Sequence, residues 1–277
     1  MFVKNNVGKN IPILMYHSIS EQASPKFREF TVSPSLFSEH LAYLQQHNYT
    51  TITVTQLANM LSQGSPALPE RPVVITFDDG FADFSTAALP ALKQYGFVAT
   101  LYVATAYVNA TSRWLKSERE EMRPMVTWEQ LSEISAYGVE CGGHTHTHPQ
   151  LDMLPLATAR DEITRCKQLL EEHLGRPVTS ISYPFGYYTG AVRRLVKEVG
   201  YTSACAVAHA MSTTSTDLFA LTRLFVSADT DVTALEAILT RGSTSALTTL
   251  YRRARTPALR IVRYSMTSIS NLQKRSV

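Results

Sequence analysis

Two clusters of ionisable residues in this chain have types and spacing suited to metal chemistry. Asp78 and Asp79 are adjacent and follow an apolar run that ends at Phe77, and His144 and His148 stand four residues apart behind two glycines. One carboxylate and two imidazoles form a three-ligand set that leaves the fourth position on zinc open, as in catalytic rather than structural sites. The second carboxylate is then free to act as a base toward water. The pattern therefore indicates metal-assisted hydrolysis.

The role of His146, which lies between the other two histidines, depends on the backbone conformation. In a helical turn residues four apart share a face, whereas in an extended segment all three histidines would share one. Gly142 and Gly143 before the segment and Pro149 after it favour a turn. Asp-Asp-Gly alone is common in plain turns. Its position directly after an apolar run, with histidines downstream, favours a functional site.

Apolar runs alternate with amphipathic stretches along most of the chain, which is typical of a parallel sheet with helical connections. The run Pro72–Phe77 is continuously apolar at its centre, as expected of a strand buried on both faces. The expected strands are Ile11–Tyr16, Pro72–Phe77, Phe97–Val103, Val139–Gly142, Thr179–Tyr183, Tyr201–Val207 and Leu221–Val226. One expected helix follows the Ser33-Pro34 cap, and another follows the Thr127-x-x-Gln130 capping box. Further helices are expected at Thr55–Leu61, Phe84–Tyr95, Leu156–Leu174 and Ala191–Val199. Tyr107–Met125 is the least regular inner stretch, and we expect a loop there.

The candidate residues all follow the carboxyl ends of expected strands. His17 follows the first strand, Asp78 and Asp79 the second, and His144 a later one. In a barrel of alternating strands and helices, catalytic groups gather at this end of the strands. We therefore expect these side chains to converge on one site.

The motifs Thr76-Phe77-Asp78-Asp79-Gly80 and His144-Thr145-His146-Thr147-His148-Pro149 resemble the first two motifs of the polysaccharide deacetylases with NodB homology, carbohydrate esterase family 4. The resemblance covers roughly residues 10 to 230 and continues at Leu14-Met15-Tyr16-His17, Thr127-Trp128 and Tyr183-Pro184-Phe185-Gly186. It implies an α/β fold, an irregular (β/α) barrel of about seven parallel strands. No G-x-G-x-x-G follows any expected strand, which disfavours a doubly wound dinucleotide-binding sheet.

The resemblance also implies a role for each matching residue. It makes Asp78 the general base and Asp79, His144 and His148 the metal ligands, and it leaves His146 outside the ligand set. It implies that the backbone N–H of Phe185 donates to the developing oxyanion. The implied cofactor is a divalent metal, zinc first, with cobalt or nickel as alternatives.

Two parts of the family pattern are missing. Ser182 stands where the family has an arginine that orients the base, and Arg223 is a candidate substitute, with a structural ion pair as the alternative. The family's late Leu-x-His motif, which carries the general acid, is absent. His17 and His209 are the candidates for this role, and a structural role is open for each of them.

The implied function is metal-dependent removal of acetyl groups from N-acetylated sugars in a polysaccharide, an oligosaccharide or a lipid-linked glycan. One alternative is an amidohydrolase or O-acetyl esterase acting on another substrate. A second alternative is a catalytically silent glycan-binding relative, because two motifs are incomplete.

Composition and charge place the chain among ordinary globular proteins. Hydrophobic residues make up 44% and charged residues 18%. Cys141, Cys166 and Cys205 are scattered and odd in number, so we expect free buried thiols. The first ten residues are polar and no apolar run is long enough to span a bilayer, which predicts a cytoplasmic location.

The chain is expected to divide into a deacetylase-like domain at 1–235 and a basic, helical extension at 236–277. Residues 237–277 carry eight basic and no acidic residues, whereas the remainder has a net charge of −5. Such a segment is either a solvated helix or a peripheral contact with the inner membrane face. No nucleic-acid partner is expected.

Overall fold

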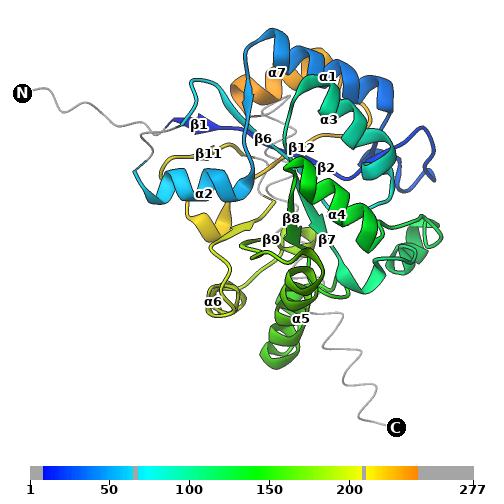
Figure 1. Ribbon diagram of the computed structural model, residues 1–277, viewed down its shortest axis with the longest axis vertical. Helices are drawn as coiled ribbons and strands as arrows, with labels where there is room; N and C mark the ends of the chain where they lie inside the picture. Colours follow the sequence, from blue (N-terminus) through cyan, green and yellow to red (C-terminus); the bar gives the residue numbers. More distant parts are fainter. Residues whose placement is uncertain (1–8, 65–67, 208–209, 243–277) are drawn as a thin grey trace, which may run out of the picture.

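The centre of the molecule is a curled parallel sheet. The computed structural model describes residues 9–64, 68–207 and 210–242 of the 277-residue chain. Neighbouring strands lie in the order β10–β9–β8–β7–β6–β2–β12, and each pair along this path is parallel (Figure 1). This arrangement agrees with the alternation of strands and helices in the sequence.

The strands of the sheet are short and follow one another along the chain. They are β2 (Ile13–Tyr16), β5 (Thr50–Thr51), β6 (Pro72–Phe77), β7 (Thr100–Val103), β8 (Glu140–Gly143), β9 (Ser180–Ser182), β10 (Ser203–Cys205) and β12 (Leu224–Phe225). Two small pairs lie outside this sheet: antiparallel β1 (Asn10–Ile11) with β11 (Ser212–Thr213), and parallel β3 (Ser18–Ile19) with β4 (Thr31–Val32).

The last strand segment touches both edges of the sheet. Leu221 pairs with Cys205 of β10, and three residues later Leu224 pairs with Leu14 of β2. The segment 221–225 therefore bridges the two edges, and the sheet curls into the irregular barrel that the resemblance implies. The expected fold class is confirmed.

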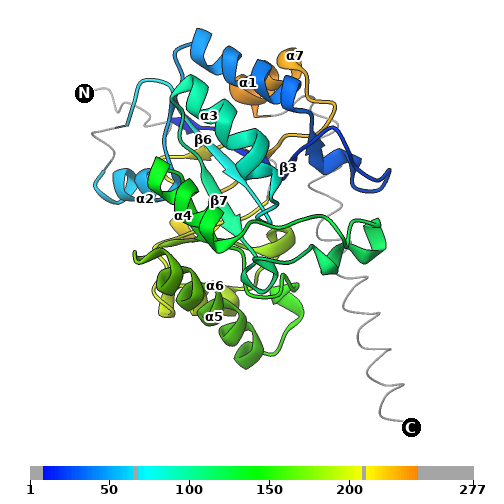
Figure 2. The ribbon, with the colours of Figure 1, turned by 45° about the vertical axis from the view of Figure 1, so that its right-hand side comes forward.

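Helices lie outside the sheet, with residues that explain where they begin and end (Figures 1 and 2). They are α1 (Pro34–Gln46), α2 (Val54–Ser62), α3 (Leu89–Tyr95), α4 (Trp128–Tyr137), α5 (Leu156–Leu174), α6 (Gly190–Glu198) and α7 (Val232–Arg241). Ser33 caps α1, and Thr127 with Gln130 forms the predicted capping box of α4. α5 has the predicted bounds and ends at Gly175, in the left-handed conformation.

Short turns of helix complete the chain between these elements. They are η1 (Arg28–Phe30), η2 (Phe84–Ala88), η3 (Thr105–Tyr107), η4 (Arg113–Glu118), η5 (Leu151–Met153), η6 (Pro184–Gly186) and η7 (Leu218–Ala220). The expected helix at Phe84–Tyr95 begins with the π-helical turn η2 before α3. The expected loop at Tyr107–Met125 contains η4.

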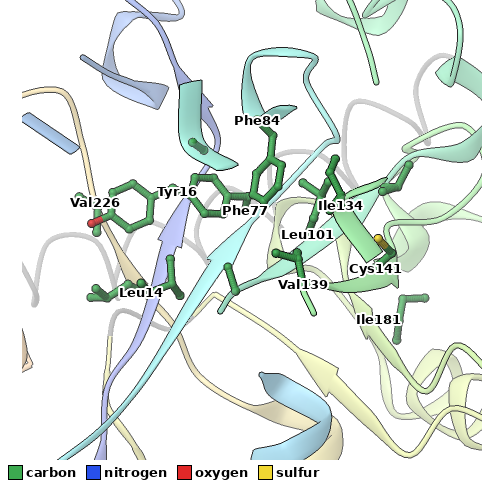
Figure 3. Packing of buried hydrophobic residues seen from close by; sticks show 14 of the residues in the cluster. Leu14, Tyr16, Phe77, Phe84, Leu101, Ile134, Val139, Cys141, Ile181 and Val226 are labelled. Atoms are coloured by element: carbon green, nitrogen blue, oxygen red, sulfur yellow. The ribbon is translucent and has the colours of Figure 1, made fainter. Parts of the chain in front are cut away.

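The main hydrophobic core lies between the sheet and the helices. Figure 3 shows Tyr16, Phe77 and Phe84 side by side, with ring centroids 5.3 Å apart for the first pair and 4.8 Å for the second. Successive β6 side chains face opposite sides, so Val73, Ile75 and Phe77 belong to this core. The opposite face of β6 points into the barrel, and Asp78 continues this face just beyond the end of the strand.

The structure also bears on the predicted thiols, on membrane-spanning helices and on the expected domain boundary. Cys141, Cys166 and Cys205 are free and buried, as predicted. No helix in the described part of the chain is long and apolar enough to cross a membrane. α7 runs across the expected boundary at residue 235, and its buried Leu235 and Ile238 belong to the main core. The rest of the basic extension, residues 243–277, lies outside the described residues, so its helical structure and membrane contact stay predictions.

Candidate active site

The two aspartates leave β6 in different directions because the backbone changes conformation between them. The backbone N–H of Asp78 continues the ladder and donates to the carbonyl of Tyr16 at 3.0 Å. Asp79 adopts a left-handed φ of 78°, and Gly80 follows with a φ of 86°. A non-glycine residue in this region is strained, and such strain is concentrated at functional sites. Both carboxylates are buried.

Asp79, His144 and His148 form a compact cluster of potential metal ligands. The Asp79 Oδ1 atom lies 3.4 Å from Nε2 of His144 and 3.2 Å from Nε2 of His148. One ligand atom from each residue falls within 4.8 Å of the others. The structure therefore brings together the three residues that the resemblance named as ligands.

The surroundings of the histidines fit a metal site. Nδ1 of His144 lies 2.8 Å from the carbonyl oxygen of Ser182, so its N–H donates there and Nε2 keeps a free lone pair. A hydrogen bond of this kind fixes the tautomer and the ring orientation of a ligating histidine. The donor set, one carboxylate oxygen and two imidazole nitrogens, suits zinc and related divalent ions.

The segment that carries the histidines is a tight turn, as the sequence predicted. Thr145 and His148 have left-handed φ values of 64° and 59°. The preceding glycines allow close packing, because a Cβ on Gly142 would lie 2.6 Å from the ring of Tyr102. A Cβ on Gly143 would lie 2.6 Å from the hydroxyl of Tyr201. No other residue type fits either position without displacement of these rings.

Arg223 forms a two-pronged ion pair with Asp78. Its Nη1 lies 2.6 Å from Oδ1 of Asp78, and its Nη2 lies 2.7 Å from Oδ2. Nη2 also donates to the hydroxyl of Ser182 at 2.8 Å, and Nη1 to the hydroxyl of Thr76 at 3.2 Å. The guanidinium is fully buried. Arg223 thus reaches Asp78 from segment 221–225, the closing segment of the barrel. It lies beside Ser182, which stands at the family's arginine position.

The charges at this site shift the pKa values of its members. Burial alone would raise the pKa of Asp78, but Arg223 and His144 lower it below its usual value. Burial likewise opposes ionisation of Asp79, and the neighbouring His148 and His144 hold its pKa well below normal. The two aspartates outweigh burial at His144 and raise its pKa. Both carboxylates are therefore ionised at neutral pH.

Aromatic rings surround the site. The ring centroid of Phe185 lies 4.9 Å from that of His148, and the ring centroid of Trp114 lies 5.3 Å from that of His148. Phe185 has a left-handed φ of 59° and is half exposed. His17 packs edge-on against Phe30 and Phe225. Its Nδ1 is buried and has no hydrogen-bond partner in the described part of the chain.

Other residues considered from the sequence lie elsewhere or cannot be placed. Nδ1 of His146 lies 3.0 Å from the hydroxyl of Thr105, and His146 is outside the ligand cluster. Trp128 stacks on His173 on the helical layer, at a centroid distance of 3.9 Å. His209 lies outside the described residues. Trp114 was missed, because an aromatic residue in an irregular stretch carries no periodic signal.

Comparisons with known proteins point to one family. A family model described as polysaccharide deacetylase matches residues 65–204. The Bacillus subtilis protein YxkH, named for the same family, is 29% identical over 226 residues, 82% of this chain and 75% of YxkH. A poly-β-1,6-N-acetyl-D-glucosamine N-deacetylase of Staphylococcus aureus is 22% identical over 216 residues, 75% of this chain and 71% of that protein.

Solved structures show the same fold. The Streptococcus pyogenes deacetylase PplD, in complex with acetate, has a TM-score of 0.72 at 25% identity and covers 84% of this chain and 97% of its own. IcaB from Ammonifex degensii has a TM-score of 0.71 at 23% identity, with coverage of 85% and 97%. From the matched family model, the motifs and the curled barrel, we conclude that this chain belongs to the polysaccharide deacetylase family.

Proposed function

We propose that this protein is a metal-dependent hydrolase that removes acetyl groups from N-acetylated sugars. One observation carries the proposal: a three-residue ligand cluster lies beside an ionised carboxylate that an arginine holds in place. Asp79, His144 and His148 would hold the metal, with zinc as the first ion to test and cobalt or nickel next. When bound, a divalent ion supplies Lewis acidity toward an acyl carbonyl and acidifies water.

Asp78 is the general base in this proposal. Its Oδ2 lies 3.9 Å from Nε2 of His144, so the carboxylate faces the ligand cluster. The two contacts from Arg223 orient it and keep it ionised, ready to accept a proton from the attacking water. Arg223 acts through Asp78 and is therefore a positioning residue.

Phe185 and His17 complete the assignment. The backbone N–H of Phe185 is proposed to donate to the developing oxyanion, supported by the position of this residue against His148. His17 is proposed to protonate the leaving nitrogen. Burial lowers the pKa of His17, but the charges of Asp79 and Asp78 favour the protonated form that this role needs, and Nδ1 of His17 has no partner in the described part of the chain.

The proposed substrate is a glycan that contains N-acetylglucosamine. Support comes from the S. aureus relative, whose name specifies a poly-β-1,6-N-acetyl-D-glucosamine N-deacetylase. The silent glycan-binding alternative is based on two incomplete motifs; the ion pair between Arg223 and Asp78 answers the missing arginine, whereas the missing Leu-x-His motif still supports that alternative.

The experiment measures acetate release from β-1,6- and β-1,4-linked N-acetylglucosamine oligomers. Wild-type protein is stripped with a chelator and assayed before and after zinc is restored, beside Asp78→Asn. The proposal requires activity that returns with zinc and is lost in the variant. Zinc binding without acetate release from either oligomer would instead favour a hydrolase of another acyl substrate or a silent binder, and a panel of O-acetyl esters and small amides would separate these two.

A further inference from the structure

Glu162 lies on α5, 15 residues beyond Thr147, and it contacts residues 144–148, the ligand turn, directly. Its Oε2 accepts the backbone N–H of Thr147 at 2.7 Å, and its Oε1 accepts the hydroxyl of the same residue at 2.6 Å. Its backbone carbonyl accepts the N–H of His146 at 3.1 Å. Glu162 is buried despite its charge. Buried carboxylates that accept several hydrogen bonds hold the donating segment firmly.

The ligand turn has two sides: the segment after β7 binds one, and Glu162 binds the other together with Tyr107, whose hydroxyl donates to the Thr147 carbonyl at 3.3 Å. The segment after β7 binds the first side through backbone bonds, from Ala106 N–H to the His146 carbonyl at 2.8 Å and from Thr105 N–H to the Thr145 carbonyl at 3.3 Å. On the other side, Thr147 immediately precedes the strained ligand His148. The carboxylate of Glu162 therefore fixes the residue before His148, while the N–H of His148 itself donates to the hydroxyl of Thr145 at 3.1 Å.

Close packing of α5 on β8 makes this contact possible. Cys166, one turn along α5 from Glu162, donates to the carbonyl of Val103 at 3.6 Å. A Cβ on Gly143 would lie 3.2 Å from its sulfur. A larger residue than glycine before His144 would move the helix away from the turn, and with it the Glu162 carboxylate.

We propose that Glu162 is a positioning residue of the metal centre, which presets His148 for metal binding through Thr147. The proposal rests on the proposed function only in taking Asp79, His144 and His148 as metal ligands. It predicts that weakening this contact lowers metal affinity, because groups that orient ligands typically change affinity 10- to 100-fold when removed.

The molecule contains a matched control for this contact. At the opposite end of β8, Glu140 accepts the backbone N–H of Thr55 at 2.9 Å and the hydroxyl of Thr55 at 2.6 Å. The chemistry is the same, a carboxylate that receives both donors of one threonine, but it holds the start of α2 instead of the ligand turn. A general loss of stability should affect both contacts, and a loss of metal affinity only one.

The test is zinc affinity measured by competition with a chromophoric chelator, which needs no substrate. Glu162→Gln and Thr147→Val should each raise the Kd for zinc about tenfold or more. Thr147→Ser, which keeps the hydroxyl, should stay close to wild type, as should Glu140→Gln and Thr55→Val. Circular dichroism establishes that each variant is folded, and the Thr147 pair carries the test if Glu162→Gln does not fold.

Three outcomes would overturn the proposal: unchanged zinc affinity in folded Glu162→Gln and Thr147→Val, an equal loss in Glu140→Gln, or no zinc binding by the wild type. The proposed function fails separately. Tight zinc binding without acetate release would contradict the deacetylase assignment, while a selective loss of affinity in the Glu162 variant would still support the positioning role.

Discussion

Both ends of β8 carry ionisable side chains, but the surroundings of these side chains differ. Glu140, at the amino end, receives hydrogen bonds from Thr55, Thr100 and Ser180. His144, just past the carboxyl end and on the same face of the strand, lies among two aspartates and a second histidine in a segment with left-handed residues. The two positions are four residues apart, or about 13 Å along an extended strand.

The amino end of β8 contributes to the stability of the fold, whereas the carboxyl end contributes to the candidate site. At the amino end, the polar groups around Glu140 are donors that match its oxygens, which is the stable way to bury a carboxylate. At the carboxyl end, Nδ1 of His17 and Nδ1 of His148 are buried without partners among the described residues. Unsatisfied groups and strained backbone are costly, and they persist where the site gains from them.

The largest expected effect is on activity at the carboxyl end. Asp78→Asn should lower kcat/KM for acetate release about 100- to 10,000-fold, because the amide cannot accept the proton from water. Zinc affinity should change little, since Asp79, His144 and His148 are retained. Glu140→Gln serves as the control and should keep near wild-type activity. Substantial activity in Asp78→Asn would remove the base assignment.

Arg223→Met should cause the next largest effect, on stability. It leaves Asp78 charged and buried without its partner, and breaking such a pair typically costs about 3–5 kcal/mol in the free energy of unfolding. The double variant Asp78→Asn/Arg223→Met should recover part of this loss, which urea denaturation of all three variants would measure. Equal losses in the single and double variants would show that the ion pair is not the cause.

The same variant should alter the pH dependence of catalysis. Arg223 holds the pKa of Asp78 below its usual value, so its removal raises that pKa and protonates the base at higher pH. The acid limb of kcat/KM against pH should therefore move upward in Arg223→Met. An unshifted limb in a folded, active variant would argue against the positioning role of Arg223.

A smaller effect is expected at the amino end, and on stability alone. Glu140→Ala leaves several buried donors without an acceptor, at a typical cost of about 1–3 kcal/mol. Chemical denaturation should reveal this loss, while kcat/KM and zinc affinity should stay near wild type. A fall in activity larger than the fraction of unfolded protein explains would erase the distinction between the two ends.

The smallest expected effect is a loss of stability in mild acid. Nε2 of His40 lies 2.6 Å from the carbonyl of Thr230 and its Nδ1 lies 3.0 Å from the hydroxyl of Tyr16, and burial lowers the pKa of His40 to about 4. The unfolded chain therefore binds the proton first as the pH falls below about 6.5. Stability should fall by about 1.4 kcal/mol between pH 8 and pH 5.5 from this group alone.

His40→Gln provides the comparison for this pH effect. The variant lacks the titrating group, so its unfolding free energy should change less with pH over the same range, whatever its absolute stability. The two pH profiles of urea denaturation give the answer. Parallel profiles for wild type and variant would assign the acid sensitivity to other groups.

Local patterns in the sequence predicted most of the fold. The buried run at Pro72–Phe77, the capping box at Thr127 and the glycine after Leu174 each act within a few residues, and each element lies where expected. The buried thiols and the parallel sheet were also predicted correctly from the sequence, whereas the closure into a curled barrel was implied by the family resemblance. Such signals suffice because strand and helix formation depend on periodicity and caps.

The site could be predicted only where its residues form motifs. The aspartates and histidines were found in this way, and the structure brings them together. Arg223 was a candidate only because the family's arginine was missing, since its partner Asp78 is 145 residues away. Glu162, Glu140 and Trp114 were not found, because a contact between two separate segments leaves no trace in the local pattern of either.

The position of Arg223 on the closing segment also affects how the protein is made. Asp78 emerges from the ribosome well before Arg223, and chains are synthesised at roughly 5–20 residues per second. For the several seconds between them, a nascent chain holds the carboxylate without the guanidinium that stabilises it in the barrel. Asp78, the proposed base, thus depends on a segment made 145 residues later, and a chain that stops before residue 223 would contain both the aspartate and the histidine motifs and still lack the arginine that holds Asp78.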